Sequence, residues 1–209
     1  MWLLTTGIFA GPKREATAEG LEKDMAVSFL SRLAMIRELG ADWTSPRPAG
    51  ERRPRVFVMG APGTGQVGAL DDLNAEQKYE SMKVHMNTVA GNEALVHVAA
   101  KRYPGVAFFG LNPGLIKTNI RANVLGGQGS FRFKAVESLI GFFTPSTEDY
   151  ADLMVPLLLS PELDAHSGAL FNARARPIER SEGMTLEHAE KLISASEALI
   201  DRARSTGGA

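Results

Sequence analysis

The chain of 209 residues contains no cysteine, which excludes disulfide bonds and metal sites built from thiolates. It also lacks an excess of one charge: 23 basic and 24 acidic residues give a formal net charge of −1, which offers no electrostatic attraction to nucleic acid or an anionic membrane. The four histidines are scattered, so we expect no metal site. No apolar run approaches the roughly 20 residues of a membrane-spanning helix. We therefore expect a cytoplasmic protein whose partner is a small molecule or another protein.

The rest of the sequence alternates between two apolar patterns. Short apolar or β-branched runs are typical of buried strands, and they cover residues 2–6, 55–59, 106–111 and 168–172. Helical spacing of apolar residues is found at 21–39, 76–101, 147–159 and 186–202. No internal repeat or linker divides the chain. The alternation predicts an α/β fold with a partial doubly wound parallel sheet of about four strands, in a single domain over residues 1–209.

Tyr79 and Lys83 form a candidate catalytic pair. They stand four residues apart in the helix predicted at 76–101, and side chains at this spacing share one helix face. The pKa of an unperturbed tyrosine is about 10, so a tyrosine that exchanges protons at neutral pH requires a neighbouring cation such as a lysine ammonium. Taken alone, the spacing is more typical of a solvated helix face.

Two further segments give this pair a context. Asp71–Asn74 precedes the predicted helix, and the turn Asn112–Gly114 follows the third predicted strand. In this order, the strands, the helix and the turn resemble the short-chain dehydrogenases/reductases, and among them the retinol-dehydrogenase-like and fungal members. The resemblance implies a Rossmann-like fold, an NAD(P) cofactor and the interconversion of alcohols and carbonyl compounds. It also implies that Tyr79 exchanges the proton at the substrate oxygen, while Lys83 lowers the pKa of the tyrosine and binds the nicotinamide ribose.

The same resemblance implies the cofactor contacts. Gly7 ends a turn that reads Asn-Ala-Gly in the family. Beyond Pro113 and Gly114, the backbone of Ile116 and the hydroxyl of Thr118 match the positions that face the nicotinamide amide in the family. Taken alone, a Pro-Gly pair is typical of a plain turn that ends a strand.

Other positions depart from the family pattern. The catalytic serine should end the second strand, where this chain has Gly60 and Ala61, and neither can bind a substrate carbonyl through its side chain. The active-site asparagine is matched by Ser28. At most two of the four catalytic roles remain. We therefore expect impaired or absent hydride transfer by this chain, and we keep a non-catalytic binding or interaction module as the alternative.

The catalytic register is itself open. The tyrosine precedes the proline of the turn by 34 residues instead of the family's roughly 30, about one helical turn too many. Counting back from that proline places Lys83 and Asn87 at the two catalytic positions. Counting forward from Asp71–Asn74 places His85 and Val89 there instead.

The resemblance begins only at the family's fourth strand. In the family, a glycine-rich turn after the first strand holds the cofactor pyrophosphate at a helix N-terminus, and this sequence shows no such turn. The strand at residues 2–6 would then lie on an open sheet edge, which favours association with another chain. We expect a marginally stable chain, or a homodimer that forms through this edge or through the long helices.

The glycine-rich segment 60–67 provides a third hypothesis. It follows a strand and resembles the phosphate-binding loop of ATPases, with the pattern G-x-x-x-x-G-K-[S/T]. Gln66 replaces the lysine that would contact the phosphates, and Val67 replaces the hydroxyl that would hold magnesium. The third hypothesis is therefore a degenerate nucleotide-binding loop.

Overall fold

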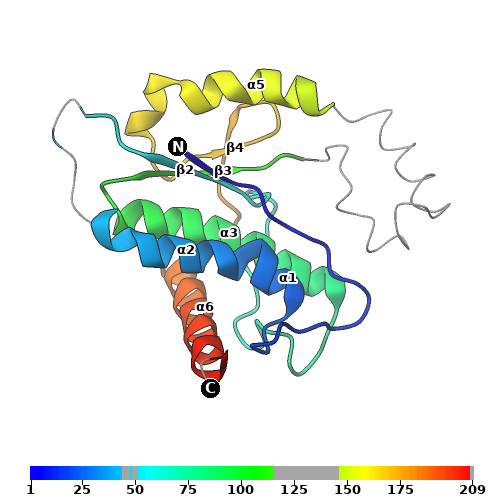
Figure 1. Cartoon of the computed structure of the whole chain (residues 1–209). Helices are drawn as coiled ribbons and strands as arrows, with labels where there is room; N and C mark the ends of the chain where they lie inside the picture. The colour runs from blue at the N-terminus through cyan, green and yellow to red at the C-terminus, as the bar shows by residue number, and fades with distance from the viewer. Residues whose placement is uncertain (44–47, 49–50, 115–145, 208–209) are drawn as a thin grey trace.

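The structure is a computed structural model that describes residues 1–43, 48, 51–114 and 146–207. Its centre is a five-stranded sheet in the order β1-β2-β3-β4-β5 (Figure 1). The strands are β1 Trp2–Leu4, β2 Arg55–Met59, β3 Ala107–Leu111, β4 Leu170–Phe171 and β5 Pro177–Ile178. The first four are parallel, which confirms the predicted α/β fold, and β5 pairs antiparallel with β4. The sequence did not predict β5, because it has only two residues and one is a proline.

β1 lies at the edge of the described sheet and pairs there with β2. The exposed fraction is 38% for Trp2 and 44% for Leu3, so the prediction of a buried strand is wrong at this position. An apolar run predicts burial only where other elements cover the strand. The expected edge position and the expected parallel pairing are both observed.

Helices cover both faces of this sheet, as in a doubly wound fold (Figure 1). They are α1 Lys23–Met25, the π-helical turn η1 Ala26–Leu30, α2 Ser31–Leu39, α3 Ser81–Arg102, α5 Thr147–Leu159 and α6 Leu186–Gly207, with 3-10 turns at Gly40–Trp43 and Pro161–Ala165. α5 lies on one face, and α1, α2 and α3 lie on the other. None of the helices in the described part of the chain is both long and apolar enough to cross a membrane.

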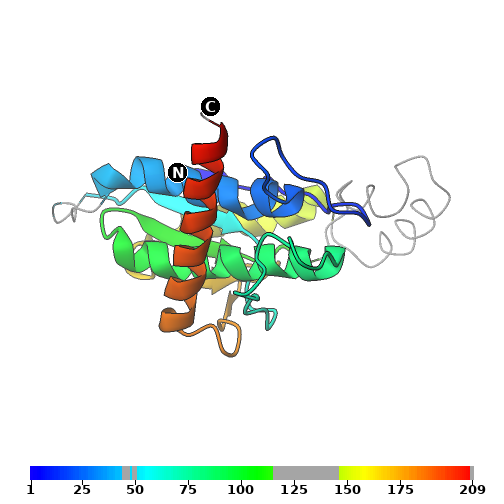
Figure 2. The ribbon, with the colours of Figure 1, turned by 90° about the horizontal axis from the view of Figure 1, so that it is seen from below.

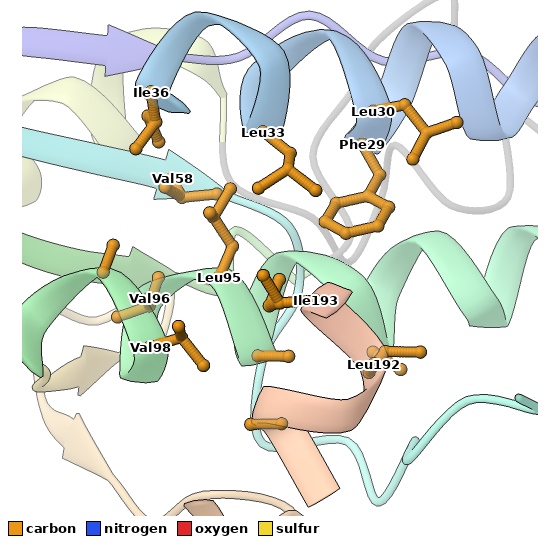
Figure 3. Packing of buried hydrophobic residues seen from close by; sticks show 14 of the residues in the cluster. Phe29, Leu30, Leu33, Ile36, Val58, Leu95, Val96, Val98, Leu192 and Ile193 are labelled. Atoms are coloured by element: carbon orange, nitrogen blue, oxygen red, sulfur yellow. The ribbon is translucent and has the colours of Figure 1, made fainter. Parts of the chain in front are cut away.

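The larger hydrophobic core fills the space between the sheet, α2, α3 and α6 (Figure 3). Phe29 and Leu33 point from η1 and α2 toward Leu95 of α3, and Ile193 joins them from α6. Gly91 allows α3 to come this close, since a Cβ at this position would lie 2.6 Å from the Phe29 ring. These contacts fix α3 against the helical segment that follows β1.

The last helix, α6, crosses α3 on its outer side (Figure 2). Most side chains of α3 are buried, from Val84 to Ala99, because the sheet and α2 cover one side and α6 covers the other. The outer surface of α3 is therefore occupied by α6 of the same chain.

Helices begin at local capping residues unless another side chain binds the same backbone amides. Ser146 begins α5 in a capping box with Asp149, and the Thr185 hydroxyl accepts a hydrogen bond from His188 N at the start of α6, so both helices begin where the sequence predicted them. The prediction that α3 begins near residue 76 is wrong. The carboxylate of Asp72 accepts hydrogen bonds from the backbone amides of residues 76–78 and holds them in a turn, so the helix begins only at Ser81.

Candidate active site

The carboxyl ends of β1, β2 and β3 meet at one edge of the sheet, which we call the carboxyl edge. Leu4 is in register with Val58, and Met59 is in register with Leu111. Ligands of parallel α/β sheets bind outside this edge. The backbone that leaves the three strands, at residues 5–7, 60–61 and 112–114, therefore forms the candidate site.

Three of the predicted cofactor-binding residues, Gly7, Pro113 and Gly114, lie at the carboxyl edge. The other two, Ile116 and Thr118, lie outside the described residues. Asn112 shapes the turn that ends at Gly114: its side chain donates to Pro62 O at 2.9 Å and accepts from Gly114 N at 3.0 Å. Gly114 has a φ of 62°, which favours glycine.

Arg32 of α2 ties the ends of two strands together beneath this edge. It is 2% exposed, and its guanidinium donates to the carbonyl oxygens of Thr6 and Met59 and to the side chain of Asn92. Its Nε has no hydrogen-bond partner among the described residues. Burial lowers the pKa of Arg32 to about 10, and none of its bonded partners is a carboxylate. The carboxyl edge therefore lies over a buried positive charge.

A second buried polar group joins α1 to α3. The Asp24 carboxylate is fully buried, with Oδ2 at 2.9 Å from His85 Nδ1 and Oδ1 accepting from the Ser28 hydroxyl at 2.5 Å. Ile8 N donates to the same hydroxyl at 3.0 Å. The Phe9 ring stacks against the imidazole with a centroid distance of 3.8 Å. This group adjoins the backbone that leaves β1.

The structure does not bring Tyr79 and Lys83 together. Tyr79 precedes the first residue of α3, so the two side chains do not share a helix face, and this part of the prediction is wrong. The Tyr79 hydroxyl donates to Gly11 O at 2.8 Å. The Lys83 ammonium is largely exposed and binds the Glu80 carboxylate at 3.1 Å.

The surroundings of Tyr79 also oppose its predicted role. Burial raises the pKa of Tyr79, and the negative charges of Glu22 and Asp24 raise it further. A tyrosine that exchanges a proton at neutral pH needs a pKa below its ordinary value. The Arg14 guanidinium lowers the pKa of Tyr79, but burial and the carboxylates outweigh it.

The two alternative registers offered Asn87, Val89 and His85, and the structure places these residues differently. The Asn87 side chain is held by Ala69 N, and Val89 is buried at 5% exposure, so neither can reach a ligand at the carboxyl edge. At the serine position, Gly60 has no room for a side chain: a Cβ there would lie 2.4 Å from the Asn92 Cβ. Of the residues offered by the alternative registers, only His85 stands next to the candidate site.

The glycine-rich segment 60–67 has its amides engaged by protein groups. Gly63 N donates to the buried Glu93 carboxylate at 2.8 Å, and Gly65 N donates to the Ser181 hydroxyl at 3.0 Å. A phosphate would need these same donors, and the carboxylate would repel it. These contacts argue against a nucleotide-binding loop.

No group of three or more histidine and acidic side chains among the described residues could hold a metal ion. The carboxyl edge is better suited to a nicotinamide group than to a metal ion. Gly7 and Gly114 leave backbone uncovered by side chains, and a Cβ at Gly7 would come to 3.6 Å from the Ser28 hydroxyl and 4.0 Å from an Arg32 nitrogen. The backbone at Gly7 thus lies over two buried polar groups that are hydrogen-bonded within the protein.

Sequence reasoning missed Asp24 and Arg32. Both stand in a segment recognised only as an apolar helix, and their partners are distant in sequence: Asp24 contacts a histidine 61 residues later, and Arg32 contacts Asn92, 60 residues later. The available signal was a charged residue on the apolar face of a predicted helix, which requires a buried partner.

The chain is similar in sequence to proteins named oxidoreductases. No protein-family model matches the chain. It is 45% identical over 202 residues to an uncharacterized oxidoreductase of Saccharomyces cerevisiae, covering 96% of this chain and 65% of the yeast protein. It is 29% identical over 187 residues to a protein of Streptomyces lividans named a probable oxidoreductase, covering 83% of this chain and 59% of that protein. The chain therefore spans less than two thirds of either relative.

A crystal structure of an uncharacterized protein from Mycobacterium paratuberculosis has a similar fold. The TM-score is 0.57 at 18% identity, and the match covers 94% of this chain and 65% of that protein. At this identity the similarity concerns the fold alone. Over nearly its whole length, the chain is thus an α/β protein similar to proteins named oxidoreductases.

Proposed function

We propose that the chain carries the nicotinamide and substrate side of an NAD(P)-dependent oxidoreductase of the short-chain dehydrogenase/reductase type, acting on an alcohol or a carbonyl group. The main support is the carboxyl edge itself, where the backbone of Gly7 lies over the buried guanidinium of Arg32. The relatives named oxidoreductases support the reaction class.

Each part of this edge has a task in the proposed reaction. A bound nicotinamide dinucleotide supplies or receives the hydride. Gly7, Pro113 and Gly114 would hold its nicotinamide end, because their backbone is accessible at the strand ends. The positive charge of Arg32 favours negative charge that develops on a substrate oxygen above it.

A non-catalytic binding module is the second candidate, and one observation favours it. The close packing of Gly60 against Asn92 excludes the serine that would bind the substrate carbonyl in the family. A protein of this kind would keep a ligand site at the carboxyl edge and lack turnover.

Calorimetric titration with NADPH and with NADH tests the proposed function. We expect binding by the chain, and a loss of about tenfold in affinity, or 1.4 kcal/mol, in the Gly7→Val variant. The added side chain covers the backbone, yet its Cβ meets no atom closer than 3.6 Å, so the fold should be kept. Gly11→Val is the matched control, since a Cβ there meets nothing closer than 4.0 Å and lies farther along the loop. Absence of binding to either dinucleotide would contradict the proposal.

A further inference from the structure

The Asp24–His85 pair has the geometry of an oriented imidazole. The Asp24 carboxylate is fully buried and both of its oxygens are engaged, by His85 Nδ1 at 2.9 Å and by the Ser28 hydroxyl at 2.5 Å. A carboxylate accepts hydrogen bonds and cannot donate them, so Nδ1 carries a proton. A carboxylate at one ring nitrogen fixes the tautomer and the ring orientation. Nε2 is then the atom that can take or give a proton.

The imidazole is held from a second side and is still accessible. The Phe9 ring lies against it with a centroid distance of 3.8 Å and an interplanar angle of 33°. The side chain of His85 is 15% exposed, whereas its partner Asp24 is fully buried. The contacts with described residues engage Nδ1 and the ring face. A small ligand can therefore reach the ring without disturbing the buried carboxylate.

The pair lies where a substrate of the proposed enzyme would bind. Phe9 and Ile8 follow directly after Gly7 at the carboxyl edge, and Ile8 N donates to the Ser28 hydroxyl at 3.0 Å. The π-helical turn η1 begins two residues after Asp24 and includes Ser28. Such turns occur often at functional sites, because an extra residue in the turn redirects the side chains around it.

The arrangement is not that of a serine nucleophile. In a hydrolytic triad the hydroxyl contacts the histidine nitrogen that removes its proton. Here the Ser28 hydroxyl donates to Asp24 instead of to His85. The imidazole is free to serve a substrate oxygen, and Ser28 serves to hold the carboxylate.

We infer that His85, oriented by Asp24, is the residue that exchanges a proton with the substrate oxygen, an assignment that rests on the proposed oxidoreductase function. In the reducing direction, the hydride adds to the carbonyl carbon and the Nε2 proton of the imidazolium moves to the carbonyl oxygen. The products are an alcohol, the oxidised dinucleotide that gave the hydride, and a neutral imidazole, which regains its proton from water. In the oxidising direction, neutral Nε2 accepts the hydroxyl proton while the hydride leaves the carbinol carbon for the oxidised cofactor.

Nuclear magnetic resonance of the full chain labelled with ¹⁵N at histidine tests the site without turnover. The probes are 2-propanol and acetone, the smallest secondary alcohol and ketone, which any pocket for a larger one can admit. We expect the Nδ1-protonated tautomer in neutral His85 and a probe-dependent shift of its Nε2 signal. His166 is the matched control, because it is exposed and distant from the site in sequence. The Nε2-protonated tautomer, or no shift of His85 with either probe, would overturn the inference.

Turnover gives the second readout. We expect His85→Gln to reduce the rate of carbonyl reduction about 100-fold or more, the usual contribution of a general acid or base. Cofactor affinity should stay within twofold, and His166→Gln should react as the wild type does. Thermal melting checks that the His85→Gln variant is folded, and Asp24→Asn, which keeps the imidazole, should show an intermediate rate. A His85→Gln variant with the wild-type rate would overturn the inference.

The two readouts separate two kinds of failure. A chain that binds no dinucleotide but shows the His85 probe shift would contradict the proposed function and support the acid–base site. A chain that reduces carbonyl compounds with a rate insensitive to His85 would support the proposed function and contradict the site. In that case, loss of turnover in Tyr79→Phe would return the role to Tyr79.

Discussion

Glu93 lies in the middle of α3 with its side chain fully buried, and it holds the glycine-rich segment 60–67 against the turn before α6. Its Oε2 accepts hydrogen bonds from Gly63 N at 2.8 Å and from the Ser181 hydroxyl at 2.8 Å, and its Oε1 accepts from Ser181 N at 2.6 Å. We predict that Glu93→Gln destabilises the protein, because an amide can present a carbonyl oxygen to only one of these two sets of donors.

The magnitude follows from counting donors. With the amide oxygen toward Gly63, the amide nitrogen faces Ser181 N, so one buried donor is left without an acceptor at a cost of about 1 to 3 kcal/mol. The remaining hydrogen bonds lose their charge assistance, which accounts for about half of their strength. We therefore expect a loss of about 3 kcal/mol. For a chain of this size that corresponds to about 6 to 12 °C in Tm.

The effect of Glu93→Gln should depend on pH. Burial by itself raises the pKa of Glu93, but His97 and the hydrogen bonds from Gly63 and Ser181 outweigh it, so the pKa lies below its ordinary value. A carboxyl group whose pKa is lower in the folded state contributes fully above the unfolded value of about 4.3, and the contribution is lost as the pH falls through the folded value. The difference between wild type and variant should therefore be constant near neutral pH and shrink in acid.

Urea unfolding followed by circular dichroism at several pH values measures this difference. Glu190→Gln is the matched control, because Glu190 binds Lys101 at 3.2 Å on the surface with both side chains about half exposed. Exposed pairs of this kind contribute about 0.2 to 1 kcal/mol. A Glu93→Gln variant within 1 kcal/mol of wild type, with an unchanged dependence on urea, would refute the reasoning that Glu93 anchors the segment.

Three further predictions concern Arg32, Gly60 and Tyr79. Arg32→Met should lower the free energy of unfolding by about 1 to 3 kcal/mol, measured by urea unfolding, because the buried Asn92 side-chain oxygen and the part-buried carbonyl oxygens of Thr6 and Met59 lose their donor. Gly60→Ser should destabilise by about 1 to 3 kcal/mol in the same assay, and it should not raise turnover, since its Cβ would lie 2.4 Å from Asn92. Tyr79→Phe should cost about 1 kcal/mol for the lost bond to Gly11 O and change turnover less than fivefold; a loss of 100-fold would restore Tyr79 as the catalytic acid.

The elements that the sequence predicted well are those specified by neighbouring residues. Ser146 and Thr185 cap α5 and α6 through amides three residues further on, and β2 is bounded by loop residues on both sides. The edge position of β1 followed from the resemblance, because the resemblance begins only at the family's fourth strand. In the family, that strand pairs with an earlier one. The exposure of Trp2 did not follow, since an apolar run carries no information about which elements cover it.

The candidate site was harder to predict because its contacts are distant in sequence. The i, i+4 spacing of Tyr79 and Lys83 indicates a shared helix face only if both residues lie in the helix. Tyr79 does not, because the Asp72 carboxylate accepts hydrogen bonds from the amides of the preceding turn and α3 begins only after it. The Asp24–His85 contact joins residues 61 positions apart and leaves no local pattern. Two alternative registers followed from counting residues, and one of them offered His85, the residue that we propose for proton exchange.

Deuterium transfer tests the central claim most directly. The full chain is incubated with NADPH or NADH deuterated at C4 and with a panel of ketones and aldehydes, and the alcohols are analysed by mass spectrometry. The sequence alone predicted impaired or absent transfer, because the family's catalytic positions are not filled. With His85 in the proton-exchanging role, we instead predict deuterium at the carbinol carbon with the wild-type chain and with Tyr79→Phe, and a decrease of about 100-fold with His85→Gln. Binding of the dinucleotide without deuterium in any alcohol, or equal transfer by wild type and His85→Gln, would contradict the account.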